Sequence, residues 1–171
     1  MGMQLIETVE VGAGGAASIE FTGIPQDGVD LVLLTSLRVD RAFEASFLYA
    51  TINNDSGANY SYIGLRGYNS SASSDSASSN TLLNFNSIVP GNLATANTFG
   101  NHQMYFSNYA GTSPKSISMD AVSETNSALA GQRIEAMLWN QTTAITSIEL
   151  KALGGDYVLG STASLYKITA D

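Results

Sequence analysis

Apolar and polar residues alternate with a period of two through most of this 171-residue chain. Because successive side chains of a β-strand point to opposite faces, this period predicts strands with one face in a core and the other in water. Ile117, Met119 and Ala121, which alternate with serine and aspartate, are a clear example, and Ile148 with Leu150 is another. The alternation therefore excludes a mainly helical fold.

Two other strands near the end of the chain carry charged residues between their apolar ones. The alternation rule predicts that the apolar set lies in the core and the charged set in water. The residues assigned to the core in this way are Ile134, Ala136, Leu138, Tyr166 and Ile168. The residues assigned to water are Arg133, Glu135 and Lys167.

Turn signals rich in glycine, proline and asparagine separate these runs every ~8–15 residues. The predicted strands cover residues 3–11, 16–22, 29–39, 46–53, 59–67, 81–89, 98–107, 115–123, 132–140, 144–152 and 161–169. Many short strands at this spacing predict an all-β fold, an antiparallel β-sandwich of the jelly-roll-like kind. We expect one domain over residues 1–171, since ~150 residues suffice for a single core.

Two segments do not follow the strand pattern. Residues 69–80 form a low-complexity serine-rich stretch, which predicts a flexible, solvated loop inserted between two strands, or a contact loop that orders on binding. The segment Val39–Ser46 is rich in helix formers, and either a short helix or a loop between strands accounts for it.

The charge balance limits the partners. The chain has Lys+Arg 7 against Asp+Glu 15, a net charge of −8, and no cysteine. Binding to nucleic acid needs clustered basic residues, so no nucleic-acid partner is expected. Disulfides and thiolate metal sites are excluded. The longest apolar stretch, Val29–Val39, is too short and too polar to cross a bilayer, and no signal peptide is recognisable, so no membrane partner is expected.

Candidate catalytic groups are few. His102 is the only histidine, and a serine-histidine-acid triad depends on it, but no Gly-x-Ser-x-Gly motif occurs. We expect His102 to be a strand residue at the margin of the core or at a subunit contact. The carboxylates considered for glycoside hydrolysis are Asp27 with Asp30, Asp40 with Glu44, Asp120 with Glu124, and Glu135. No catalytic residue, cofactor or metal site is predicted.

Other polar segments are explained by turns and surfaces. The segment 53–59 resembles part of a calcium loop but lacks the terminal glutamate, so a turn between strands is predicted. The chain has eight tyrosines, and exposed tyrosine beside asparagine and serine is typical of sugar-binding and protein-binding surfaces. Half-buried strand positions explain them as well.

Several segments resemble small structural proteins of tailed bacteriophages, especially cyanophages and marine phages. They are residues 5–25, 95–100, 105–109, 137–148 and 161–166, so the resemblance extends from about Leu5 to Ile168. It implies a virion component with a β-sandwich or jelly-roll fold, and it carries over no functional residues.

Two functions are consistent with that resemblance. The first is a capsid decoration, or cement, protein: a homotrimer bound to the major capsid protein on the outer surface of the virion, assembled in the host cytoplasm. The second is a tail or baseplate fibre tip that binds host glycans. We expect the contact elements to be the N-terminal strand and the serine-rich segment. The contact residues predicted on that basis are Leu5, Ile6, Tyr68, Ser71 and Asp75.

Overall fold

The computed structural model describes residues 2–126 and 129–170, and within them it contains twelve β-strands and no helix. The larger sheet consists of β1 (Gly2–Glu10), β3 (Asp30–Leu37), β5 (Tyr60–Tyr68), β6 (Ser71–Asn80), β8 (Gly100–Phe106), β9 (Lys115–Ser123), β10 (Gly131–Trp139) and β12 (Thr162–Thr169). The smaller consists of β2 (Ser18–Phe21), β4 (Ala45–Ile52), β7 (Leu83–Pro90) and β11 (Ile148–Ala152).

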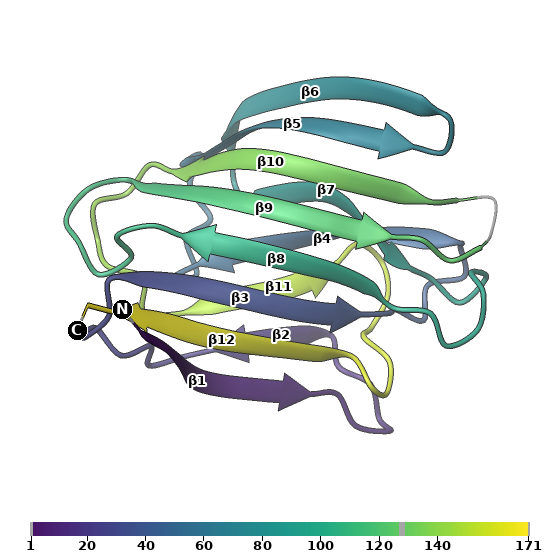
Figure 1. Cartoon of the computed structure of the whole chain (residues 1–171), viewed down its shortest axis with the longest axis horizontal. Coiled ribbons are helices and arrows are strands. Elements are labelled where there is room, and N and C mark those ends of the chain that lie inside the picture. The colour runs from purple at the N-terminus through teal and green to yellow at the C-terminus, as the bar shows by residue number, and fades with distance from the viewer. Residues whose placement is uncertain (1, 127–128, 171) are drawn as a thin grey trace.

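All strand pairs are antiparallel, and the two sheets lie face to face as a sandwich (Figure 1). The larger sheet has the order β1-β12-β3-β8-β9-β10-β5-β6, and the smaller has the order β2-β11-β4-β7. Strands β1 and β6 are thus the two edge strands of the eight-stranded sheet, and we call these edges its margins. In Figure 1 the β5–β6 hairpin projects beyond the small sheet. The predicted all-β antiparallel sandwich is confirmed.

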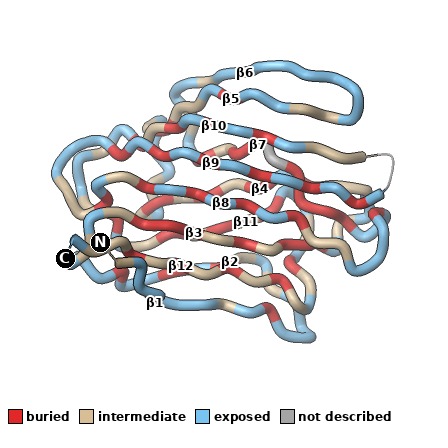
Figure 2. Tube along the Cα trace, in the orientation of Figure 1, coloured by how far each residue is buried: buried red, intermediate tan, exposed pale blue. Residues whose placement is uncertain are grey.

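One hydrophobic core fills the space between the sheets, as the buried segments in Figure 2 show. Along β9 the burial alternates strictly, and Ile117, Met119 and Ala121 face inward as predicted. Ile148 and Leu150 on β11 are buried as well. The largest fully buried side chains in the described residues are Trp139, Tyr60, Tyr109, Tyr157, Phe21, Phe85 and Phe106.

The prediction for the faces of β10 was wrong. Arg133 and Glu135 are 3% and 2% exposed, whereas Ile134 is 63% exposed. The physical reason is that Met137 and Trp139 occupy the same face as the two charged residues, and burying these two large side chains determines which face turns inward. The opposite charges lie together, which lowers the cost of burying both.

The faces of β12 were also predicted wrongly. Tyr166 lies on the outer face, and Lys167 lies on the inward face with Ala163 and Leu165, only 8% exposed. A lysine can bury its methylene chain while its ammonium group reaches a partner. Here Lys167 Nζ lies 2.6 Å from Asp27 Oδ1.

The serine-rich segment is not a loop. Residues 71–80 form β6, which pairs with β5 along almost its whole length. A two-residue turn joins the strands, and Asn69 adopts a φ of 51° there, a conformation that asparagine tolerates better than most residues. Low strand propensity and low complexity predicted a loop, but pairing with β5 outweighs propensity. By contrast, residues 40–44 form an irregular loop, as one of the two interpretations of that segment predicted.

Candidate functional site

Within residues 2–126 and 129–170, no strand or loop layer covers the outer face of the eight-stranded sheet (Figure 1). The strand pairing places on it Met3, Leu5, Thr8, Glu10, Val32, Leu34, Gln103, Tyr105, Ser118, Asp120, Val122, Gln132, Ile134, Ala136, Ile63, Leu65, Gly67, Ala72, Ser74, Ser76, Ser164 and Tyr166. Asp30 at the start of β3 adds a further carboxylate. No lysine or arginine is among these positions, so the face is low in charge, and its few charges are all negative.

Three aliphatic residues at one end of this face, Ile63, Leu65 and Ile134, are each more than 60% exposed, and we call them the aliphatic patch. Leu65 and Ile134 are direct cross-strand partners on β5 and β10. Adjacent exposed aliphatic side chains of this kind are common in interaction surfaces.

A shallow, open hollow of about 550 Å³ lies beside the aliphatic patch. Its outward-facing lining consists of Leu65, Gly67, Ala72, Ser74, Asp120, Gln132 and Ile134. Small residues on β5 and β6 leave the space, since Gly67, Ala72 and Ser74 fill little of it. The hollow thus combines an aliphatic floor with one carboxylate, one amide and one hydroxyl.

On the inward face of the large sheet, Arg133 of β10 contacts residues of β5 and β6 as well as its own strand. We call Asp75, Arg133, Glu135, Tyr62 and Asn86 the Arg133 cluster. Arg133 Nη2 lies 2.5 Å from Glu135 Oε1 and 2.8 Å from Asp75 Oδ1. Asn86 Nδ2 donates hydrogen bonds to the Tyr62 hydroxyl at 2.7 Å and to Asp75 Oδ2 at 3.0 Å. Asp75 is the one charged residue of β6, and its ion pair with Arg133 connects this edge strand to β10.

The electrostatics of the Arg133 cluster are set by burial. Burial raises the pKa of Glu135 to about 7, although Arg133 opposes that shift. Gly64 makes the arrangement possible, because a Cβ atom on Gly64 would lie 2.5 Å from Arg133 Nη2 and 2.7 Å from Glu135 Cγ. The carboxyl group of Glu135 is completely buried, so a substrate cannot reach it.

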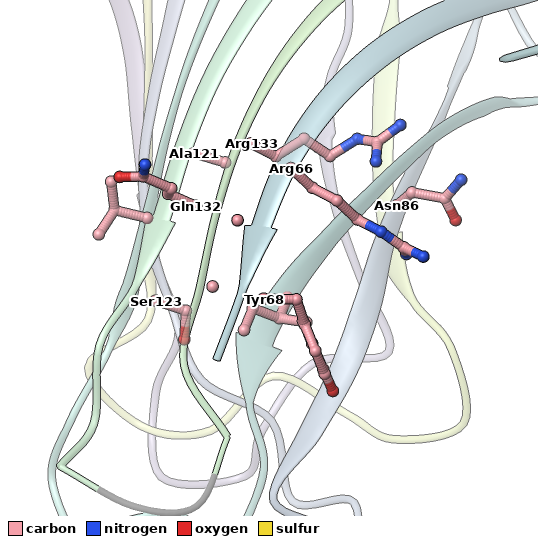
Figure 3. A pocket seen from close by; sticks show the side chains of 11 residues that line it. Arg66, Tyr68, Asn86, Ala121, Ser123, Gln132 and Arg133 are labelled. Atoms are coloured by element: carbon pink, nitrogen blue, oxygen red, sulfur yellow. The ribbon is translucent and has the colours of Figure 1, made fainter. Parts of the chain in front are cut away.

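A small pocket lies next to this cluster, and Figure 3 shows the side chains that line it. Its volume of about 10 Å³ corresponds to roughly one water molecule. Arg133 is among its lining residues, with Asn86 of β7 and Ser123 of β9. The pocket is too small for an organic ligand.

The predicted contact residues fall into two groups at opposite margins of the large sheet. Leu5 is 51% exposed on β1, while Ile6, at a bulge, packs partly against the core. Tyr68 and Ser71 flank the turn of the β5–β6 hairpin and are cross-strand partners. Asp75, on the same hairpin, faces inward, and its carboxylate forms an ion pair with Arg133.

His102 lies in the core rather than at its margin. Its Nδ1 is 3.0 Å from Thr35 Oγ1, and burial lowers its pKa to about 4. Asp55 closes the predicted turn, because it accepts hydrogen bonds from Gly57 N at 2.8 Å and Trp139 Nε1 at 2.7 Å.

The paired carboxylates considered for catalysis have separate structural contacts. Asp27 pairs with Lys167, Asp30 accepts from the Tyr105 hydroxyl and from Asn108 N, and Asp40 accepts from Asp156 N at 2.9 Å. Glu124 accepts from Asn126 N at 2.7 Å. None of these contacts joins two carboxylates of a considered pair.

Neither the aliphatic patch nor the hollow was predicted from the sequence. For Ile134 the alternation of apolar and charged residues was recognised, but it was interpreted as a core position. Ile63 and Leu65 alternate with tyrosine, glycine and arginine, so both faces of β5 are mixed and neither is marked as exposed. Pairing with β10, which no local pattern reveals, brings these residues together.

Within residues 2–126 and 129–170, no group of three or more histidine, aspartate or glutamate side chains is arranged to hold a metal ion. In the same part of the chain no helix has the length and hydropathy needed to span a membrane.

No family model matches the chain, and the comparison with curated proteins finds none that is similar. Among solved structures, an exo-inulinase from Aspergillus awamori is similar at 14% sequence identity with a TM-score of 0.36. That similarity covers 99% of this chain but only 29% of the exo-inulinase chain.

Proposed function

We propose that this protein is a structural component of a phage virion, a capsid decoration protein that binds the outer surface of the shell and strengthens contacts between capsomers. In this proposal it acts as a homotrimer on the major capsid protein. The observation that carries the proposal is the uncovered outer face of the eight-stranded sheet, with the aliphatic patch at one end. The resemblance of the sequence to phage structural proteins supports the same function.

The mechanism is passive binding. Burying aliphatic surface such as Ile63, Leu65 and Ile134 is favourable at ~25 cal/mol per Å². Because the outer face carries few charges, little free energy is lost in removing charges from water. Because a homotrimer links three copies, its three contacts with the shell act together, and each copy then needs only a modest interface.

The charge of the chain fits an outward position. A net charge of −8 repels packaged DNA and keeps the free protein soluble. We propose that the two margins of the sheet make the contacts between copies, β1 with Leu5 and Ile6 on one side and the β5–β6 hairpin with Tyr68 and Ser71 on the other. Assembly in the reducing host cytoplasm agrees with the absence of cysteine.

A non-catalytic role is part of the proposal. Glu135 has the raised pKa that is typical of a catalytic acid, but its carboxyl group is fully buried. The alternative, a tail fibre tip that binds host glycans, relies on exposed tyrosines. Tyr60, Tyr109 and Tyr157 are fully buried, which leaves fewer aromatic platforms for sugar rings.

The test is quantitative mass spectrometry of purified particles of the phage that encodes the chain. A copy number comparable with that of the major capsid protein supports the decoration protein. A few copies per particle, together with specific binding on a glycan array, supports the fibre tip. Absence from mature particles contradicts both.

A further inference from the structure

The hollow beside the aliphatic patch places a carboxylate next to aliphatic side chains. Asp120 faces outward on β9 and is the one carboxylate among the outward-facing residues that line it. Its cross-strand neighbours are Ile134 and Gln103, so no basic residue of the large sheet lies opposite it. An unpaired carboxylate beside aliphatic surface is complementary to a cation with an apolar stem.

Arginine and lysine side chains have that combination, since several methylene groups carry a charged head group. Leu65 and Ile134 supply surface for the methylene groups, and Asp120 supplies the opposite charge. Gln132 and Ser74 add an amide and a hydroxyl within the same lining. The volume of about 550 Å³ leaves room for one such side chain together with a neighbouring residue.

Two arginines of the chain also line the hollow, but both are engaged elsewhere. Arg133 is buried on the other face of the sheet with Glu135 and Asp75. Arg66 alternates with the outward residues of β5, and its Nε donates a hydrogen bond to Ser73 Oγ at 3.0 Å. In these contacts neither guanidinium group forms an ion pair with Asp120.

We infer that this hollow is a recognition site for a basic side chain of a partner protein, with the stem of an arginine or lysine on Leu65 and Ile134 and its head group at Asp120. The net charge of −8 favours a basic partner over a second copy of the chain. This inference deepens the proposed function and rests on it only for the identity of the partner, since the hollow and its chemistry belong to this chain.

The probe is acetyl-Leu-Arg-amide, compared with acetyl-Leu-citrulline-amide, which has nearly the same shape and no charge. Amide chemical shifts of the ¹⁵N-labelled full chain locate the binding site. We expect the arginine probe to shift Leu65, Asp120 and Ile134 and to bind about tenfold more tightly than the citrulline probe. The variant Asp120→Asn removes that difference, and Ser74→Phe, which fills the hollow, weakens both probes.

The control variant is Glu10→Gln, which removes a carboxylate from the far end of the same face and leaves binding unchanged. Equal binding of the two probes overturns the inference, as do shifts centred on β1 or no binding at all. A failed probe experiment leaves the virion copy number unaffected. Conversely, absence from virions contradicts the proposed function while leaving the basic-side-chain site in place.

Discussion

Arg133 and Glu135 are two residues apart on β10 and form an ion pair on the buried face of the strand, with 2.5 Å between Nη2 and Oε1. The same Nη2 lies 2.8 Å from Asp75 on β6. One buried guanidinium thus connects β10 to the serine-rich edge strand β6. The stability of that margin is expected to depend on this cluster more than on the serines of β6.

Replacing Arg133 tests that dependence. Arg133→Met leaves Glu135 buried without its cation, and we expect a loss of ~3–5 kcal/mol in the free energy of unfolding. Hydrogen exchange should accelerate most at residues 71–80, because Asp75 also loses its partner. Chemical denaturation and exchange mass spectrometry measure the two effects.

The matched control is Arg66→Met on the neighbouring strand. Arg66 is exposed, so its replacement should change the free energy of unfolding by no more than ~0.5 kcal/mol. Equal losses in the two variants would show that the cluster has no special role.

The pH dependence of stability contains a contribution from Glu135. Its pKa is about 7 in the folded protein against 4.5 for an ordinary glutamate. The folded state therefore binds the proton more tightly, and the contribution of Glu135 to stability falls as the pH rises from 4.5 to 7, by on the order of 3 kcal/mol. Urea unfolding of wild type and Glu135→Gln at several pH values isolates it, because the advantage of wild type over the variant should shrink across that range. A constant difference contradicts the buried carboxyl group.

His102 contributes with the opposite sign. Burial lowers its pKa from 6.5 to about 4, so the unfolded chain takes up the proton first as the pH falls. Its contribution is complete above pH 6.5 and is lost as the pH falls towards 4. We expect the advantage of wild type over His102→Asn in unfolding free energy to decrease across that interval. If both proteins respond to acid equally, His102 is not buried in its neutral form.

Gly64 is predicted to be required for the Arg133 cluster. A methyl group there would come within 3 Å of both Arg133 and Glu135, so Gly64→Ala should cost ~1–3 kcal/mol in the free energy of unfolding. On the outer face of the same strand, a Cβ on Gly67 would lie 3.5 Å from Gln132 Cγ, an ordinary contact, so Gly67→Ala should be tolerated. Thermal unfolding distinguishes them, and similar melting temperatures would rule out the predicted clash.

Apart from β6, the strands lie close to where local sequence predicts them, but the faces that β10 and β12 turn toward the core do not follow from local sequence. Periodicity predicted β9 and β11 correctly because only one of their faces is apolar. On β10 both alternating sets contain large apolar residues. Burial of Trp139 determines which set faces the core, and the ion pair between Arg133 and Glu135 lowers the cost of burying the charges on that face. The alternation rule places every charged residue in water, so it cannot predict that two opposite charges are buried together.

β6 illustrates a second limit. Its composition predicts a loop, and what makes it a strand is non-local: the β5 partner, the turn at Asn69 and the Asp75 ion pair. The hollow depends on the same pairing, since Ser74 and Ala72 border Leu65 only once β6 is in register. Asp75 was predicted to be a contact residue, and in the structure its carboxylate forms an ion pair with Arg133 of the same chain.

The central claim is that the outer face binds the shell, and the most direct measurement is binding of purified chain to particles that lack it. The double variant Leu65→Ser/Ile134→Ser removes two exposed side chains, so its fold should be unchanged. Leu153→Ser, at an exposed leucine after the small-sheet strand β11, is the control. We predict that wild type and control bind with the same affinity and that the double variant binds at least about tenfold more weakly. Equal binding by all three proteins, or no binding by wild type, would contradict the claim.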